Sequence, residues 1–348
     1  VRQLTIRGSG IELEAMDSGV LLTQAARGAV VEANRLEGNL FGVYAHGAAD
    51  ALVQGNTIVG RQDLRLADAG NGVSIWNAPG AAVVDNDIRF GRDGIFVVTS
   101  RQNRFERNRF RDLRFAVHYM YTKDSRVVGN ASERNHAGWV IMFSNGVQIV
   151  DNTVVDNRDH GLLLHSSNEA VVSGNSVLGG ASSEKCSFVY NSNKNRITRN
   201  RFEGCGIGIH FTAGSDRNVV SENAFVRNRT QVKYVGTRNL DWAANGRGNY
   251  WSDHPAFDLD GDGIADLPYR PNDLMDEILW ALPLAKALLN SPAVEAVRWA
   301  QRQFPALLPG GVIDSAPLMT PPPASPSTAA VTATPALRAS ASAAEIRP

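Results

Sequence analysis

Two methionines and a histidine recur at nearly equal intervals in the middle of the sequence and could bind a soft metal ion. Met120 precedes Met142 by 22 residues, and Met142 precedes His165 by 23. Thioether sulfur and imidazole nitrogen are donors that suit copper(I), whereas calcium, magnesium and most hydrolytic reactions prefer other groups. If the fold brings these side chains together, they form a candidate site for weak, transient copper(I) binding, with His118 beside them.

A second candidate metal site lies in the acidic stretch FDLDGDGIAD. The stretch supplies oxygen donors at positions 1, 3, 5, 7 and 9 of a calcium-type loop, namely Asp258, Asp260, Asp262, the carbonyl of Ile264 and Asp266. Gly263 stands at position 6, where such a loop turns sharply. Tyr269 replaces the usual bidentate Glu at position 12, which predicts lower affinity for calcium or a donor from another segment. The alternative is an Asp/Gly-rich turn that merely ends the preceding structure.

An asparagine repeat supplies the framework that must position the Met and His side chains. The marker asparagines follow one another at intervals of 22 to 30 residues, and they are Asn34, Asn56, Asn86, Asn108, Asn130, Asn152, Asn175, Asn200 and Asn223. Apolar residues flank each marker at the third position before and the second after, except that Ser132 follows Asn130. Units this short cannot bury an apolar face alone and must stack on their neighbours. The repeat predicts an all-β fold, a right-handed parallel β-helix of roughly ten turns whose stacked asparagines form a hydrogen-bonded ladder.

A second strand begins eight to nine residues after most markers, usually at a glycine. Alternation places the first and third residues after that glycine inside and the second and fourth outside. The second-position column reads Tyr44, Ser74, Phe96, His118, Val140, Leu163, Val189 and His210. The fourth-position column reads His46, Trp76, Val98, Met120, Met142, His165, Asn191 and Thr212.

The middle of this outward face is more apolar than a solvated face would be. We expect Phe96, Val98, Val140 and Leu163 to contact a partner protein. The same pattern fits a strip that is only covered by a loop or a cap, in which the methionines fill gaps and bind no metal.

The repeat stops near residue 229, and the rest of the chain differs in character. We expect a β-helix over residues 1–235, a junction with the acidic loop over 236–272, a helical docking segment over 273–310, and an extended segment with a disordered Pro/Ala-rich tail over 311–348. The helical segment carries more large apolar residues than short helices can bury among themselves. Trp280, Leu288 and Trp299 are therefore predicted partner anchors. The alternative is that these helices cap the open end of the rod.

Composition excludes several classes of protein. The chain has 348 residues with 35 Lys and Arg against 35 Asp and Glu, and no run of 18 apolar residues. This balance argues against a generic nucleic-acid binder and a membrane span.

Two cysteines, Cys186 and Cys205, fall in adjacent turns, where a disulfide and two free thiols are equally conceivable. The first residues look like a strand and show no export signal, which suggests a processed or truncated piece.

Several stretches taken together resemble the NosD family of nitrous oxide reductase maturation proteins. They are FAVHYMYTKDSRVVGN, GWVIMFSNGVQIVDN and GLLLHSSN, followed by GNYWSDH, FDLDGDGIADLPYRP and PLAKALLNSPAVEAVRWAQRQFP. The resemblance spans about residues 1–320. It implies a periplasmic accessory protein, not an enzyme, that helps assemble copper centres. The implied partners are an ABC transporter with permease and ATPase subunits, a membrane-anchored copper chaperone and the apo nitrous oxide reductase.

A carbohydrate-active β-helix, a polysaccharide lyase or hydrolase, is the competing class. Such an enzyme needs paired carboxylates, or acids with Arg or Lys along an outer groove. The fourth-position column contains no two adjacent acids. Asp93, Asp112, Glu133, Asp156 and Asp159 do lie near the bends, which leaves this class disfavoured.

Overall fold

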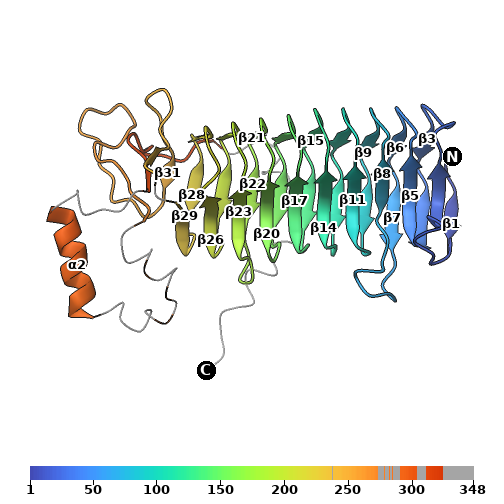
Figure 1. Cartoon of the computed structure of the whole chain (residues 1–348), viewed down its shortest axis with the longest axis horizontal. Helices are drawn as coiled ribbons and strands as arrows, with labels where there is room; N and C mark the ends of the chain where they lie inside the picture. The colour runs from blue at the N-terminus through green and yellow to red at the C-terminus, as the bar shows by residue number, and fades with distance from the viewer. Residues whose placement is uncertain are drawn as a thin grey trace.

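The computed structural model is a right-handed parallel β-helix, drawn as a rod of stacked turns in Figure 1. The structure describes residues 1–236, 238–272, 278, 282, 284, 291–303 and 311–323. Three parallel sheets run along the rod, and consecutive strands of one sheet come from consecutive turns. The predicted fold class and the roughly ten turns are confirmed.

The ten-stranded sheet carries the predicted Met and His column. Its strands are β2 (Ser18–Leu22), β5 (Phe41–His46), β8 (Val73–Trp76), β11 (Asp93–Val98), β14 (Phe115–Met120), β17 (Ala137–Met142), β20 (His160–His165), β23 (Lys185–Tyr190), β26 (Ile207–Thr212) and β29 (Thr230–Val235).

In the eleven-stranded sheet, each strand from β4 to β28 begins directly after a marker asparagine. Its strands are β1 (Thr5–Arg7), β4 (Arg35–Asn39), β7 (Thr57–Gly60), β10 (Asp87–Arg89), β13 (Arg109–Arg111), β16 (Ala131–Glu133), β19 (Thr153–Val155), β22 (Ser176–Leu178), β25 (Arg201–Glu203), β28 (Ala224–Val226) and β31 (Tyr250–Trp251). The nine-stranded sheet precedes the markers and comprises β3 (Val30–Glu32), β6 (Leu52–Gln54), β9 (Ala82–Val84), β12 (Arg104–Glu106), β15 (Arg126–Val128), β18 (Gln148–Val150), β21 (Val171–Ser173), β24 (Arg196–Thr198) and β27 (Val219–Ser221).

The marker asparagines form the predicted ladder at the bend between these last two sheets. From Asn34 to Asn223, each side-chain amide donates to the Oδ1 atom of the next marker at 2.9–3.0 Å. The ladder continues to Asn249. All of these amides are buried, so the stack satisfies polar groups that would otherwise be costly inside the rod.

Side chains from all three sheets fill the rod, and the largest fully buried ones include Trp139 and Tyr119. Ser132, the exception in the repeat, is also buried. Its Oγ atom accepts hydrogen bonds from the side-chain amides of Asn135 and Asn157, both at 2.8 Å. A serine therefore replaces an apolar residue here because it pairs two buried amides.

The carboxyl-terminal end of the rod is closed by two segments far apart in sequence. Strand β30 (Leu240–Asp241) pairs with β32 (Val312–Ile313). Next to β32, the buried Asp314 carboxylate accepts hydrogen bonds from the Asn249 backbone N–H at 2.6 Å and from Trp251 Nε1 at 2.8 Å. Burial raises the pKa of Asp314, although these hydrogen bonds oppose the rise. An aspartate thus terminates the asparagine ladder.

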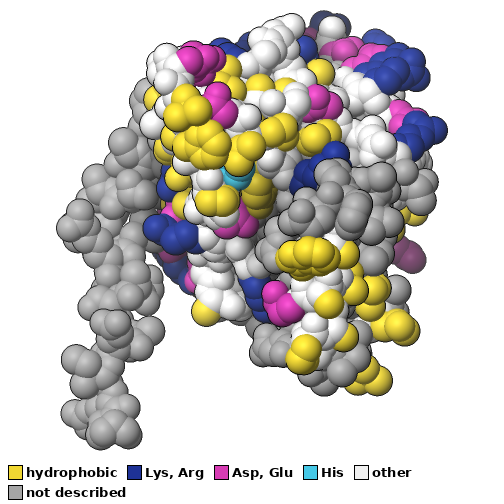
Figure 2. All heavy atoms as spheres, turned by 90° about the vertical axis from the view of Figure 1, so that its left-hand side faces the viewer, with side chains coloured by type: hydrophobic (Ala, Val, Ile, Leu, Met, Phe, Trp, Pro, Cys, Tyr) yellow, Lys and Arg dark blue, Asp and Glu magenta, His cyan; other side chains and the backbone are white. Residues whose placement is uncertain are grey.

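Helix α2 (Pro292–Gln303) lies beyond this end of the rod in Figure 1. Figure 2, which looks onto the same end, shows hydrophobic side chains interspersed with charged ones of both signs. No helix among the described residues is both long enough and apolar enough to cross a bilayer.

Cys186 and Cys205 form a disulfide that links β23 to the turn that precedes β26. The structure thereby resolves the alternative that the sequence leaves open.

Candidate functional site

The outer face of the ten-stranded sheet brings the predicted copper donors into one column. Met120 is the register partner of Met142, and Met142 is the register partner of His165. Neighbouring strands lie about 4.8 Å apart. All three side chains are half-buried, so they are held by the sheet and still face solvent. The spacing argument correctly predicted that these donors would be neighbours.

In one turn of the rod, the predicted inward and outward positions are shifted by one residue. Ser187 pairs with Leu162, and Tyr190 pairs with His165, so Phe188 and Tyr190 face outward while Val189 is buried. The predicted outward positions of Val189 and Asn191 therefore have to be corrected. This turn lacks the usual glycine, and Cys186 occupies its place; a slip of one residue reverses the two faces of a strand.

Aromatic rings lie beside the Met and His column and at its end. The Tyr121 and Phe143 rings stack with centroids 5.1 Å apart, Phe143 lies 5.1 Å from His165, and His165 lies 5.0 Å from Tyr190. Tyr121 and Phe143 have φ angles of 55° and 49°, a left-handed conformation that is unfavourable for bulky residues. The same turn has this conformation at Asn77, Thr99 and Ser166, so it belongs to the regular bend of the rod.

Sequence reasoning missed these aromatic residues, although a signal was present. Equivalent turn positions after other strands of this sheet are occupied by small or polar residues, which include Gly47, Asn77, Thr99, Ser166 and Asn191. Both rings keep a large accessible surface, since Tyr121 is 56% exposed and Phe143 is 38% exposed, and neither belongs to the main hydrophobic core. They therefore add little to the core while bordering the metal donors.

His118 lies in the neighbouring column and is buried. Its Nδ1 atom is 3.1 Å from Asp93 Oδ2, and its Nε2 atom is buried without a partner among the described residues. Arg114 Nε donates to the other Asp93 oxygen at 2.8 Å. Burial alone would raise the pKa of Asp93, but His118 and Arg114 outweigh it and hold this pKa below its ordinary value. A histidine fixed by a carboxylate at one nitrogen and free at the other is the usual arrangement of a metal ligand.

The predicted partner-contact residues differ in how much surface they expose. Phe96, Val98 and Leu163 are half-buried on the outer face. Val140 is only 1% exposed, so in this structure its side chain has almost no surface to contact a partner. In the helical segment, Trp299 is 56% exposed on α2. Trp280 and Leu288 lie outside the described residues.

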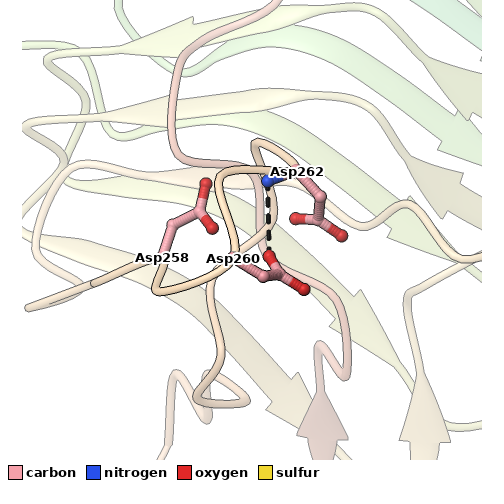
Figure 3. A group of neighbouring side chains, drawn as sticks. All are labelled: Asp258, Asp260 and Asp262. Atoms are coloured by element: carbon pink, nitrogen blue, oxygen red, sulfur yellow. Dashed lines mark hydrogen bonds between the residues drawn. The ribbon is translucent and has the colours of Figure 1, made fainter.

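The acidic loop brings three of its carboxylates together. Ligand oxygens of Asp258, Asp260 and Asp262 lie within 4.8 Å of one another. Figure 3 shows the three side chains around the turn of the loop. The Asp258 carboxylate accepts hydrogen bonds from two loop amides, Gly261 N–H at 2.7 Å and Gly263 N–H at 2.8 Å, and the second of these is the larger cause of its lowered pKa.

The other predicted members of the loop are placed differently. Asp266 accepts a hydrogen bond from the Leu259 N–H at 2.8 Å. The Tyr269 hydroxyl, at position 12, donates to Asp253 at 2.9 Å. Ile264 bridges to Leu318 in the carboxyl-terminal segment, so the loop is joined to the cap of the rod.

Chemically, the column offers two thioethers and one imidazole on a rigid sheet, with aromatic rings beside them. These donors fit copper(I), whereas the oxygen atoms of the acidic loop fit a hard cation such as calcium. The two candidate sites are thus separate in position and in chemistry.

Comparisons with known proteins identify the family of this chain. The model of a family described as periplasmic copper-binding protein (NosD) matches residues 56–256. Two relatives, each described as probable ABC transporter binding protein NosD, are 40% identical to this chain. The one from Stutzerimonas stutzeri matches over 92% of this chain and 76% of its own length, and the one from Pseudomonas aeruginosa PAO1 over 92% and 78%.

Solved structures with a similar outline include the Dettilon tailspike protein, with TM-score 0.45, 16% identity, and coverage of 68% of this chain and 47% of that chain. A mutant of the periplasmic alginate epimerase AlgG has TM-score 0.44, 14% identity, and coverage of 61% and 62%. The family match and the two relatives decide the assignment: this chain belongs to the NosD family of periplasmic copper-binding proteins.

Proposed function

We propose that this protein is a periplasmic accessory protein that presents copper(I) on the outer face of its β-helix during assembly of the copper centres of nitrous oxide reductase. The observation that carries the proposal is the column of Met120, Met142 and His165 on three consecutive strands. Copper(I) is the cargo in this proposal. The protein binds it, holds it and releases it without chemical change.

The geometry favours transfer over storage. Three half-buried donors on one sheet leave the metal accessible from solvent, so a partner's ligands can replace them one at a time. The stacked rings of Tyr121 and Phe143 lie beside the column and would limit water on that side. His118, which Asp93 orients through Nδ1, is the proposed fourth donor.

We infer partners from the names of the relatives, from the family resemblance and from the exposed apolar residues. The proposed partners are an ABC transporter with its permease and ATPase subunits, a membrane-anchored copper chaperone and the apo reductase. Phe96, Val98 and Leu163 form the proposed contact around the copper column. Trp299, with Trp280 and Leu288, forms the proposed transporter contact. The protein acts by binding, so we assign it no reaction of its own.

Calcium is the proposed ion of the acidic loop. Asp258, Asp260 and Asp262 already converge, and the Ile264 to Leu318 bridge ties the loop to the capping segment. A bound calcium would therefore fasten the cap of the rod, away from the copper column.

Copper(I) competition against a chromophoric chelator tests the main proposal. The site variant is Met120→Leu/Met142→Leu/His165→Gln. A matched control, Met16→Leu/Met319→Leu/His46→Gln, removes the same donor types elsewhere, including a histidine of the same face. We expect the site variant to bind copper(I) about tenfold more weakly or worse, while the control matches the parent. Equal competition by the site variant and the parent would contradict the proposal.

The transporter contact is tested separately by co-purification with the transporter. Trp299→Ala removes a large exposed side chain, so we expect it to reduce recovery of the transporter without changing the melting temperature. Unchanged recovery would place the contact elsewhere on the chain.

A further inference from the structure

A cavity of about 140 Å³ opens on the outer face of the ten-stranded sheet, towards the amino-terminal side of the copper column. Strands β5, β8 and β11 form its floor, and the segments around Leu13 and Gly70 form its walls. The loop between β7 and β8, which contributes Gly70, protrudes from the rod in Figure 1. The cavity is therefore built by an insertion into the repeat.

The lining is mainly aromatic and apolar, and its polar members are Asn71, Ser74 and Arg92. Phe41 and Tyr44 are stacked with centroids 5.2 Å apart, and Trp76 and Phe96 lie on the neighbouring strands. A lining of this kind, at this volume, accommodates one large apolar side chain.

Arg92 is the single charged residue among the twelve that line the cavity. Its Nε atom is buried and has no hydrogen-bond partner, and no ion pair to its guanidinium is found within the described part of the chain. The nearest carboxylate in sequence, Asp93, is already engaged by Arg114 and His118. The side chain as a whole is half-buried, so its guanidinium lies at the edge of the cavity. An unpaired guanidinium in this position favours an occupant that carries an anionic group.

The cavity is continuous with the outer face of the sheet. Val98, which lines the cavity, is the register partner of Met120, and Met120 pairs with Met142. An occupant that followed this face would extend beyond the cavity, which favours an internal segment of a protein chain over a chain end or a small molecule.

We propose that this cavity receives a segment of a partner protein in which an aromatic or large aliphatic side chain stands next to an acidic one. The apolar side chain enters between Tyr44, Trp76 and Phe96, and the carboxylate accepts hydrogen bonds from Arg92. This contact requires no copper, so it stands apart from the metal proposal and can be tested on the metal-free protein.

The test is an NMR titration of the full chain with acetyl-Gly-Phe-Glu-Gly-amide, in which both termini are blocked. We expect the indole N–H signal of Trp76 and the Nε–H signal of Arg92 to shift at millimolar peptide. Replacing Glu by Gln in the peptide should weaken binding about tenfold, because it removes one charge-assisted hydrogen bond. A peptide with Ala in place of Phe should bind more weakly still.

Variants of the protein complete the experiment. Arg92→Met should bind the Glu and Gln peptides equally, and Arg92→Lys should restore part of the difference. Arg89→Met is the matched control, since Arg89 Nε is also buried without a partner but does not line the cavity. It should behave as the parent does.

Three results would overturn the proposal. They are an unshifted Trp76 signal, equal affinity of the parent for the Glu and Gln peptides, and equal losses in Arg92→Met and Arg89→Met. If acetyl-Gly-Gly-Phe with a free carboxyl terminus binds better than the blocked peptide, the occupant is a chain end and the proposed internal segment is wrong.

Discussion

Replacing Asn130 by alanine should destabilise the protein strongly, because this buried side chain makes five hydrogen bonds. Its side-chain Nδ2 atom donates to the backbone carbonyls of Phe105 at 2.9 Å and Val128 at 3.1 Å, and to Asn152 Oδ1 at 3.0 Å. Its Oδ1 atom accepts from the backbone N–H of Asn108 at 2.9 Å and from the Asn108 side chain at 3.0 Å.

The expected loss follows from these contacts. A hydrogen bond contributes about 1 kcal/mol net, and a buried polar group left without a partner costs about 1–3 kcal/mol. The substitution breaks five bonds and leaves the backbone N–H of Asn108 unpaired inside the rod. We therefore expect the free energy of unfolding to fall by about 6–8 kcal/mol, a large part of the roughly 5–15 kcal/mol typical of folded proteins.

Asn145→Ala is the matched control, since Asn145 also belongs to a stack of asparagines but is exposed. Its Oδ1 atom accepts from the backbone N–H of Asn168 at 3.3 Å and from the Asn168 side chain at 3.1 Å. Water can replace both bonds, so we expect a loss below about 0.5 kcal/mol.

Urea denaturation followed by circular dichroism measures both losses. Native-state hydrogen exchange should show that Asn130→Ala weakens protection first in the turns next to the substitution, because each turn of a repeat protein contacts only its neighbours. If Asn130→Ala and Asn145→Ala differ by less than about 1 kcal/mol, the buried ladder does not stabilise the rod as argued.

Three other predictions follow from the structure. Replacing Cys186 and Cys205 by alanine should lower the free energy of unfolding in urea by about 3 kcal/mol, as expected for a closed loop of this length, and a reducing agent should then have no further effect; an equal response of parent and variant to the reductant would contradict this. Burial, with the charge of Lys233, lowers the pKa of His210 to about 4. The unfolded chain therefore binds a proton between about pH 6.5 and 4 that the folded chain does not, so stability should fall as the pH drops through this window, by about 1–2 kcal/mol after allowance for solvent screening. His210→Gln should remove that dependence in melting curves recorded across the window, and a slope equal to that of the parent would rule it out. Millimolar calcium should raise the melting temperature of chelator-treated protein, and Asp258→Asn should abolish the rise; an identical rise in the variant would exclude the acidic loop as the site.

The sequence by itself determined the rod and the position of the Met and His column. The asparagine interval predicts the stack, and alternation predicts that Met120, Met142 and His165 face outward on successive strands. Both signals are local, since each depends on the period of one strand and on the length of one turn. A rigid stack then converts a regular interval in sequence into a regular distance in space.

The tertiary structure decided what periodicity does not encode. Where Cys186 replaces the usual glycine, only the pairing with β20 shows that Tyr190, and not Asn191, follows His165 in the column. The bonding of Cys186 to Cys205 likewise depends on how neighbouring turns meet.

Contacts between residues far apart in the sequence could not be predicted from the repeat either. Asp93 and His118, which are 25 residues apart, meet because consecutive turns stack. Asp314 caps the asparagine ladder 65 residues after Asn249. Such pairs form only when a later segment of the chain packs against residues of an earlier one. The physical reason is that their partners are chosen by the shape and charge of that surface, and the local period of the sequence has no information about either.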